Sequence, residues 1–367
     1  MIINKKSETD LSGFYIVYRG SVLNENTTNY GISHLLEHLC CKQFKHLYND
    51  FERYSISWNA YTGNNEVVFH MKGLDEYLNK YRQPLLDSLL KFSISENEFE
   101  KEKMVVIQEY KDTFQDQSTS SYYNLLRKVY QNYGPIGKLE SLEKITLQDA
   151  NEYWKKYLSK PSLIINVSKH NDYIGFDNFM DTHPPKFEKS SDDVIVYERM
   201  VEFSKSSVSG FIKTEDDMAY IDFVLDMLSK SLESPLSKEI REKRGLTYGV
   251  GAFISRISDD EGLIITSLVT TDDKVDEVLD VYKMVLSNPK KYLTEERFST
   301  IKDYYIVKKK KDKINLYSNV HHLIEPEGWE IQDIIDDITY EKSVDIFNKY
   351  LSYDKWTWVV DKTEYQK

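Results

Sequence analysis

The sequence predicts a mixed α+β protein built from two domains that share one order of strands and helices. Its 367 residues exceed what one hydrophobic core usually organises, and such chains commonly form domains of about 150 to 200 residues. Residues 181–193, DTHPPKFEKSSDD, combine prolines, serines and charges without an apolar period, as linkers do. We therefore expect an N-terminal domain at 1–185 and a C-terminal domain at 186–367.

The first half is predicted to open with a strand followed by a helix. Residues 14–21, FYIVYRGS, are rich in aromatic and β-branched residues, which favour strands. In the next segment four apolar residues recur at helical spacing: Ile32, Leu35, Leu36 and Leu39. The later elements that we expect are two strands around a turn at 63–65, a helical region from 74 to about 115 broken near 93–95, a helix at 147–157 and a strand at 162–169.

The second half is predicted to repeat this order, although no sequence identity between the halves is evident. A duplication is therefore a hypothesis that rests on the order of elements. The elements that we expect are a strand within 194–210, a helix at 218–232, strands in 248–257 and 262–271, helices at 273–286 and 294–316, and a last strand at 356–361.

Composition excludes several classes of protein. The net charge of −12 argues against a general nucleic-acid binder, and the two adjacent cysteines, Cys40 and Cys41, cannot form a disulfide scaffold. We interpret both as small core residues. No apolar run approaches a membrane span, and the first residues resemble neither a signal nor a transit peptide, so we expect no membrane and a cytoplasmic location.

Two histidines on the predicted helix suggest a metal site. His34 and His38 are four residues apart, so both imidazoles lie on one helix face and can reach one ion. Glu37 lies beside them, completing the pattern H-x-x-E-H of inverzincin peptidases. Zn²⁺ takes such nitrogen ligands, and a nearby carboxylate that is not a ligand can act as a base.

A third ligand has to come from another part of the chain. Glu102 and Glu109 are seven residues apart, two helical turns, and so project from one side of a helix. Either glutamate could bind the ion directly, while the other glutamate orients one of the ligands by a hydrogen bond. The alternative is that both belong to an acidic face exposed to solvent.

Five stretches, in this order, resemble the pitrilysin family of metallopeptidases, which includes insulin-degrading enzyme and mitochondrial processing peptidase. The first of these stretches, residues 20–38, resembles the family's glycine-serine turn, its acidic residue and the glycine that precedes H-x-x-E-H. The stretches are GSVLNENTTNYGISHLLEH (20–38), WNAYTGNNEVVFH (58–70), EKEKMVVIQEY (100–110), PIGKLESLEKITLQDANEYWKKYL (135–158) and SPLSKEIREKRGLTYGVGA (234–252).

The resemblance implies a fold and a zinc site. It implies two like domains, each a mainly antiparallel sheet backed by helices, which together form half of a clamshell. The implied zinc ligands are His34, His38 and Glu109. Glu37 would be the general base, and Glu102 would support the site from behind the ligands.

The resemblance also implies an activity: zinc-dependent hydrolysis of peptides or unfolded segments in an enclosed chamber. Tyr248 would donate to the developing oxyanion, and Arg241 would orient the substrate or the tyrosine. An extended peptide would add to the strand edge formed by Asn59, Ala60, Tyr61 and Thr62. The alternative is a family member without activity that binds or scaffolds partners, but such members characteristically lose motif residues that are present here.

The assembly follows from the same motifs. The family's working unit has four domains, and this chain has two yet carries both the zinc residues and the arginine-tyrosine pair. Two different subunits could each lose one set, so retention of both favours a homodimer over a heterodimer.

Overall fold

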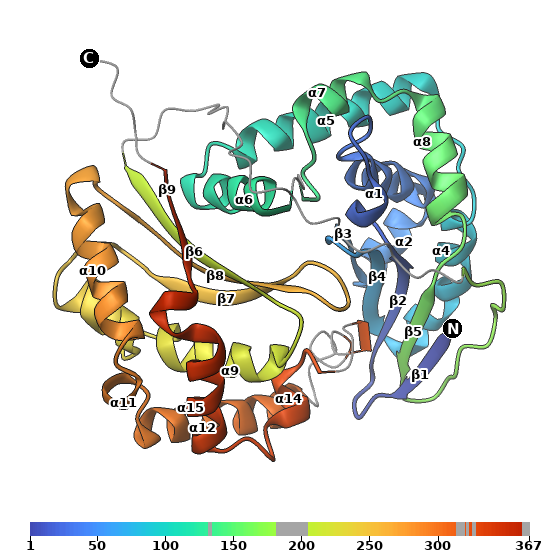
Figure 1. The fold of residues 1–367 in the computed structure, drawn as a ribbon. Helices are drawn as coiled ribbons and strands as arrows, with labels where there is room; N and C mark the ends of the chain where they lie inside the picture. Colours follow the sequence, from blue (N-terminus) through green and yellow to red (C-terminus); the bar gives the residue numbers. More distant parts are fainter. Residues whose placement is uncertain (131–133, 181–204, 313–319, 321–322, 325–327, 362–367) are drawn as a thin grey trace. The chain divides into compact units, whose positions relative to one another are not determined.

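The computed structural model describes residues 1–130, 134–180, 205–312, 320, 323–324 and 328–361, which form two compact units (Figure 1). Unit 1 takes the described residues within Met1–Asp112, Val129–Asp192 and Lys311–Ile324, and unit 2 takes those within Thr113–Lys128, Asp193–Lys310 and Glu325–Lys367. The domain boundary at 185/186 lies outside the described residues and stays a prediction. No helix in the described ranges is long and apolar enough to cross a membrane.

Unit 1 contains a five-stranded sheet in the order β1-β5-β2-β4-β3. Only β1 and β5 are parallel, and the other neighbours are antiparallel. The strands are β1 Ile2–Lys6, β2 Leu11–Arg19, β3 Ser57–Thr62, β4 Glu66–Leu74 and β5 Leu163–Ser168. The helices are α1 Ile32–Gln43, α2 Tyr48–Arg53, α3 Asp75–Leu78, α4 Arg82–Leu89, α5 Glu96–Thr113, α7 Leu139–Lys144 and α8 Leu147–Tyr153.

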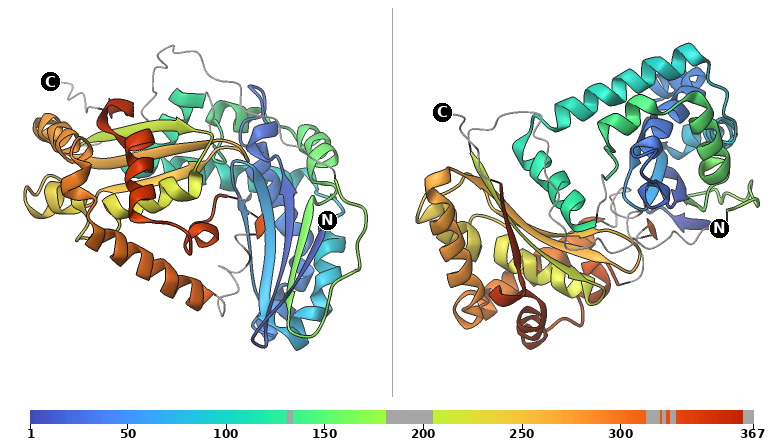
Figure 2. Two further views of the ribbon diagram at one scale, coloured as in Figure 1. Left: turned by 60° about the horizontal axis from the view of Figure 1, so that its bottom comes forward. Right: turned by 45° about the horizontal axis from the view of Figure 1, so that its top comes forward.

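Unit 2 contains a four-stranded antiparallel sheet in the order β7-β8-β6-β9. Helix α9 lies along one face of this sheet in both views of Figure 2. The strands are β6 Ser206–Thr214, β7 Gly251–Arg256, β8 Gly262–Thr270 and β9 Thr357–Asp361. The helices are α6 Gln117–Tyr130, α9 Met218–Ser229, α10 Val275–Leu286, α11 Pro289–Tyr292, α12 Glu295–Asp312, α14 Ile331–Ile334 and α15 Tyr340–Ile346.

The two units repeat one topology, as the order of elements in the sequence predicted. The series β2, α1, β3, β4, β5 corresponds to β6, α9, β7, β8, β9, and the sheet orders β3-β4-β2-β5 and β7-β8-β6-β9 match. Near the end of each half a threonine, Thr146 or Thr339, caps a helix that continues into a π-helical turn, Trp154–Leu158 or Phe347–Leu351. The predicted α+β class with two like domains is confirmed.

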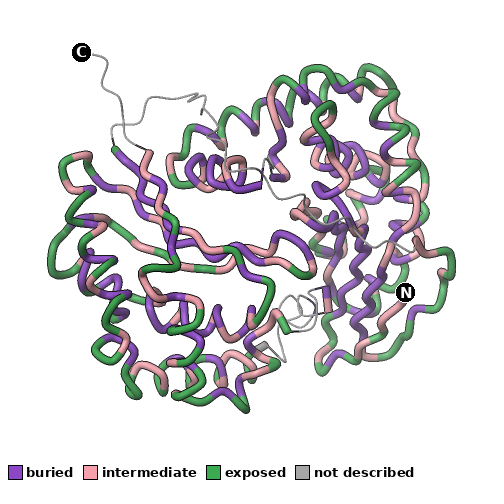
Figure 3. The backbone as a smooth tube through the Cα atoms, in the orientation of Figure 1, coloured by how far each residue is buried: buried purple, intermediate pink, exposed green. Residues whose placement is uncertain are grey.

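Burial explains why these segments form a stable frame. The central strands β2 and β4 are almost wholly buried, as the tube in Figure 3 shows. Helix α1 packs against β3 and β4 through its apolar residues, so its position follows from the core of unit 1. The site described next is therefore carried by a rigid helix rather than by a loop.

Two expectations need correction. The strand expected within 194–210 is β6 at Ser206–Thr214 where the structure describes it, because pairing with β8 continues to Thr214. Strand β1 and helix α6 were not expected at all. β1 is a short, partly exposed edge strand, and α6 begins with the polar run Gln117–Ser121, although its later residues give the helix an amphipathic pattern.

Candidate metal centre

Helix α1 presents two histidines on the side opposite its buried apolar face. The helix begins after Gly31, whose φ of 95° is a left-handed conformation that favours glycine. A Cβ at Gly31 would also come within 2.7 Å of the Leu142 side chain. The apolar residues behind the histidines, Leu35 and Leu39, are fully buried, which fixes the rotation of the helix about its axis.

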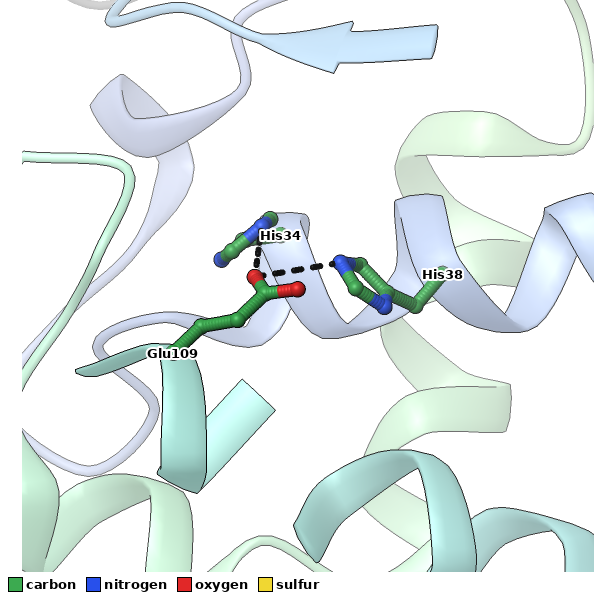
Figure 4. Close-up of side chains that lie close together, drawn as sticks. All are labelled: His34, His38 and Glu109. Carbon is green, nitrogen blue, oxygen red and sulfur yellow. Dashed lines mark ion pairs between the residues drawn. The ribbon is translucent and has the colours of Figure 1, made fainter. Parts of the chain in front are cut away.

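Glu109 on α5 meets both histidines, as Figure 4 shows. Its Oε2 atom lies 3.5 Å from His34 Nε2 and 3.5 Å from His38 Nε2. The two imidazole rings are 4.9 Å apart between centroids and nearly perpendicular. Within the part of the chain that the structure describes, this trio is the one group of histidine, cysteine and acidic residues arranged to hold a metal ion.

The donor chemistry fits zinc. Burial, reinforced by the neighbouring His38, lowers the pKa of His34 to about 4, so its imidazole is neutral near pH 7. Neutral imidazole is the form that binds metal. Two imidazoles and one carboxylate are a ligand set of catalytic zinc sites, which keep a fourth position open.

Glu37 lies next to the trio and is held by a strand residue. Its carboxylate is buried, and Thr62 Oγ1 donates a hydrogen bond of 2.6 Å to its Oε2. Burial raises the pKa of Glu37, although the Thr62 hydrogen bond acts in the opposite direction. The result is a carboxylate that takes up a proton more readily than an exposed one.

Glu102, one of the two expected glutamates on α5, lies behind His38. Its Oε2 is 3.7 Å from His38 Nδ1, and its Oε1 is 2.8 Å from Lys42 Nζ. This carboxylate therefore approaches the histidine nitrogen that faces away from Glu109. Such a partner orients a metal-ligating imidazole.

The segment from Asn59 to Thr62 lies in β3, the last strand of its sheet. Side chains along a strand point alternately to the two faces of its sheet, and the Thr62 side chain points toward α1. The neighbouring Tyr61 packs on the opposite face, against the apolar cluster that contains Tyr15 and Val17. Sequence reasoning placed Thr62 only in a peptide-binding edge and missed its contact with Glu37.

Arg241 and Tyr248 in unit 2 form a pair of their own. The guanidinium carbon of Arg241 lies 4.9 Å from the centre of the Tyr248 ring, which is the geometry of a cation–π contact. Tyr248 is 88% exposed, an unusual environment for a large aromatic side chain. Its loop is anchored by Thr247 Oγ1, which donates to the Val269 carbonyl at 2.8 Å.

The two cysteines near the end of α1 are not activated thiols. Cys40 is buried and Cys41 is partly buried, and both are free. Burial raises the pKa of both thiols well above the usual range, and the nearby Glu37 adds to the shift. Both stay protonated near neutral pH, in keeping with their interpretation as core residues.

Relatives of this chain include proteases. A protein from Rickettsia felis named "Uncharacterized zinc protease" is 23% identical over 361 residues, covering 89% of this chain and 87% of the relative. The mitochondrial-processing peptidase subunit beta of Rattus norvegicus is 24% identical over 167 residues, covering 42% of this chain and 34% of the relative. The crystal structure of a protease from Helicobacter pylori has the same fold, with a TM-score of 0.81 at 17% identity over 98% of this chain and 96% of that one.

Two family models match successive parts of the sequence. Residues 2–138 match the model described as "Insulinase (Peptidase family M16)", and residues 174–305 match the one described as "Peptidase M16 inactive domain". The first match contains all three residues of the trio as well as Glu37. The chain therefore belongs to peptidase family M16, the insulinase or pitrilysin family of metallopeptidases.

Proposed function

We propose that this chain is a zinc-dependent endopeptidase that hydrolyses peptides or unfolded segments. The observation that carries the proposal is the convergence of His34 and His38 on one oxygen of Glu109, with the buried carboxylate of Glu37 on the same helix as the histidines. Among its relatives, those named zinc proteases support the same chemistry.

The residues divide the chemistry among them. His34, His38 and Glu109 would hold zinc, which supplies a polarised scissile carbonyl and a water of lowered pKa. Glu37 accepts the proton of the attacking water and passes it to the leaving amine. Thr62 keeps one Glu37 oxygen in place, and so fixes the direction of the carboxylate.

Substrate binding is assigned to main-chain contacts. We propose that an extended peptide adds to the edge of β3 along Asn59, Ala60, Tyr61 and Thr62, which provides affinity with little sequence selectivity. Tyr248 would donate to the developing oxyanion, and the stacked Arg241 would hold the tyrosine ring. An enclosed chamber and a cytoplasmic location stay predictions from the sequence.

One metal centre per chain is proposed, in unit 1. Helix α9 of unit 2 corresponds to α1 but has no histidine in its sequence MAYIDFVLDMLS. This difference accords with the inactive-domain match of the second half. The scaffold alternative would be favoured by loss of zinc residues in unit 1, where His34, Glu37 and His38 are all present.

The endopeptidase proposal is tested with a single polypeptide offered in folded and in unfolded form. Zinc-loaded protein is expected to cut the unfolded form at internal peptide bonds, with products identified by mass spectrometry, and to spare the folded form. The absence of internal cleavage in any of several unfolded polypeptides would reject it. The Glu37→Gln variant is the matched control for contaminating proteases.

Thr62→Val is expected to lower kcat about tenfold while bound zinc stays at the wild-type level. Valine keeps the shape of threonine but has no hydroxyl to hold Glu37, and a hydrogen bond to a charged group contributes about 1.5 kcal/mol or more. Thr62→Ser, which keeps the hydroxyl, should retain most of the rate. Equal rates for the valine and wild-type proteins, or equal impairment by serine, would contradict this role.

We propose in addition that the working enzyme is a homodimer in which Arg241 and Tyr248 of one subunit serve the zinc of the other. The pair and the zinc residues are both present in one chain, so each subunit could contribute both sets. Mixing Glu37→Gln with Tyr248→Phe subunits should then restore about a quarter of wild-type activity, because half of the dimers are mixed and each has one intact site.

The matched control for subunit mixing is Glu37→Gln with His38→Ala. Both changes affect the zinc residues of unit 1, so in a mixed dimer each of the two zinc sites carries one of the changes. No site is intact, and activity should stay absent. No recovery in the first mixture, despite proven subunit exchange, would reject the shared site and leave the zinc chemistry in place.

A further inference from the structure

Helix α1 begins without a side-chain cap of its own, and Glu25 from the preceding loop supplies one. Its N-cap residue is Gly31, which has no side chain to accept a hydrogen bond. The backbone N–H of Gly31 donates to Glu25 Oε2 at 2.8 Å, and that of Ser33 donates to Glu25 Oε1 at 2.9 Å. Both carboxylate oxygens therefore bind the helix start, where N–H groups lack partners within the helix and negative charge is favourable.

The second of these hydrogen bonds fixes the residue directly before His34. Ser33 is held again through its hydroxyl, which lies 3.1 Å from the hydroxyl of Tyr153. Tyr153 in turn donates to the Ser21 carbonyl at 2.9 Å. The first turn of α1 is therefore tied both to the loop before it and to helix α8.

Close packing restrains the same turn from another side. The Gly31 backbone lies so near to Gly137 that a Cβ at Gly31 would approach the Gly137 Cα to 3.2 Å. The helix start thus rests against residues 137–142 while Glu25 holds its N–H groups. Neither contact involves the histidine side chains.

Burial opposes the charge of Glu25, and the hydrogen bonds at the helix start offset this effect only in part. Burial raises its pKa to about 7, although the hydrogen bonds from Gly31 and Ser33 favour the ionised form. A carboxyl group with a pKa higher in the folded than in the unfolded state makes the protein less stable as pH rises from about 4.5 to about 7. Local energetic costs of this kind are common at functional sites.

We infer that Glu25 is a positioning residue for the metal centre: it fixes the first turn of α1 and thereby the direction of His34 toward Glu109. The inference depends on one part of the proposed function, namely that His34, His38 and Glu109 bind zinc. Metal sites need their ligands placed to about 0.5 Å, and a restrained helix start provides that accuracy. Glu25 is the acidic residue in the first of the five stretches that resemble the family, residues 20–38. It has no role in the proposed chemistry, and the inference gives it a role in positioning His34.

Glu25→Gln tests the inference. The amide is nearly isosteric but has one acceptor oxygen, and its NH₂ group would face a backbone N–H. We expect zinc affinity, measured by competition with a chelator, to fall about tenfold or more. The absorption spectrum of the Co²⁺-substituted protein should change, since it reports ligand geometry.

Thr339→Ala is the matched control, because it removes the side-chain cap of α15, in unit 2. It should destabilise the metal-free protein and leave zinc affinity unchanged. Zinc affinity of Glu25→Gln within twofold of wild type would overturn the inference, as would an equal loss in Thr339→Ala.

A second variant keeps the inference testable if the glutamine protein does not fold. Glu25→Asp keeps the charge but is one methylene shorter, so it cannot reach both N–H groups in the same geometry, and zinc affinity should fall. Wild-type affinity in folded Glu25→Asp would overturn the inference. A wild-type protein that binds zinc but cleaves no peptide would reject the proposed function and leave this result standing.

Discussion

Glu37→Gln is expected to abolish peptide hydrolysis and leave zinc bound. The amide fits the same space and can still accept the hydrogen bond from Thr62, but it cannot take a proton from water. A general base contributes roughly 10² to 10⁴ in rate, so turnover of a quenched fluorescent peptide should fall by about three orders of magnitude. Zinc content, measured by plasma mass spectrometry on the same preparation, should match the wild type.

The outcome that contradicts this role is near wild-type turnover in a homogeneous Glu37→Gln preparation. A loss of zinc together with activity would instead indicate that Glu37 shapes the metal site. Thr62→Val separates the effects further, because it leaves the Glu37 carboxylate in place and removes only its partner.

Replacing a member of the trio is expected to remove both metal and activity. His34→Ala, His38→Ala and Glu109→Gln each delete one of the three donors that converge in the structure. Loss of one ligand from a three-ligand site should lower zinc affinity by at least about a hundredfold, by comparison with the 10 to 100-fold effect of outer partners alone. Activity at limiting zinc should fall in parallel.

The control for these variants is Glu96→Gln, a glutamate in the first turn of the same helix as Glu109. It lies about 20 Å from Glu109 along the helix axis, and so should change neither zinc content nor rate. Full metal occupancy in all three trio variants would show that the ion binds elsewhere.

The helix with the two histidines and the helix with the two glutamates could be anticipated because both depend on local periodicity. His34 and His38 share a face through their i, i+4 spacing, and Glu102 and Glu109 share one through two helical turns. Residue spacing left open which glutamate meets the histidines. The structure places Glu109 against both histidines and Glu102 between His38 and Lys42, which depends on the position of α5 relative to α1.

The contacts of Thr62 and Glu25 could not be anticipated from local pattern. Thr62 reaches Glu37 only because the register of β3 with β4 turns that side chain toward α1. Glu25 reaches the start of α1 across an irregular loop that has no period. Both contacts join segments whose relative position is set by the packed core.

The likeness of the two halves was visible as an order of elements in the sequence before it was visible as a shared fold. The shared sheet topology survives although α1 and α9 differ in their polar residues, because burial constrains only the apolar positions of each helix. The absence of histidine from α9 is compatible with the fold for the same reason. The fold by itself therefore does not require histidines at the positions of His34 and His38.

The most direct measurement is removal and return of the metal on one preparation. The purified protein is assayed on an unstructured quenched peptide, treated with a chelator, dialysed, and titrated with Zn²⁺ while bound metal and rate are recorded together. Our account predicts that hydrolysis disappears with the metal and returns in proportion to zinc, reaching its maximum at one zinc per chain, with no return in Glu37→Gln. Undiminished hydrolysis by metal-free protein, or zinc bound at one per chain in wild-type protein without any hydrolysis, would contradict it.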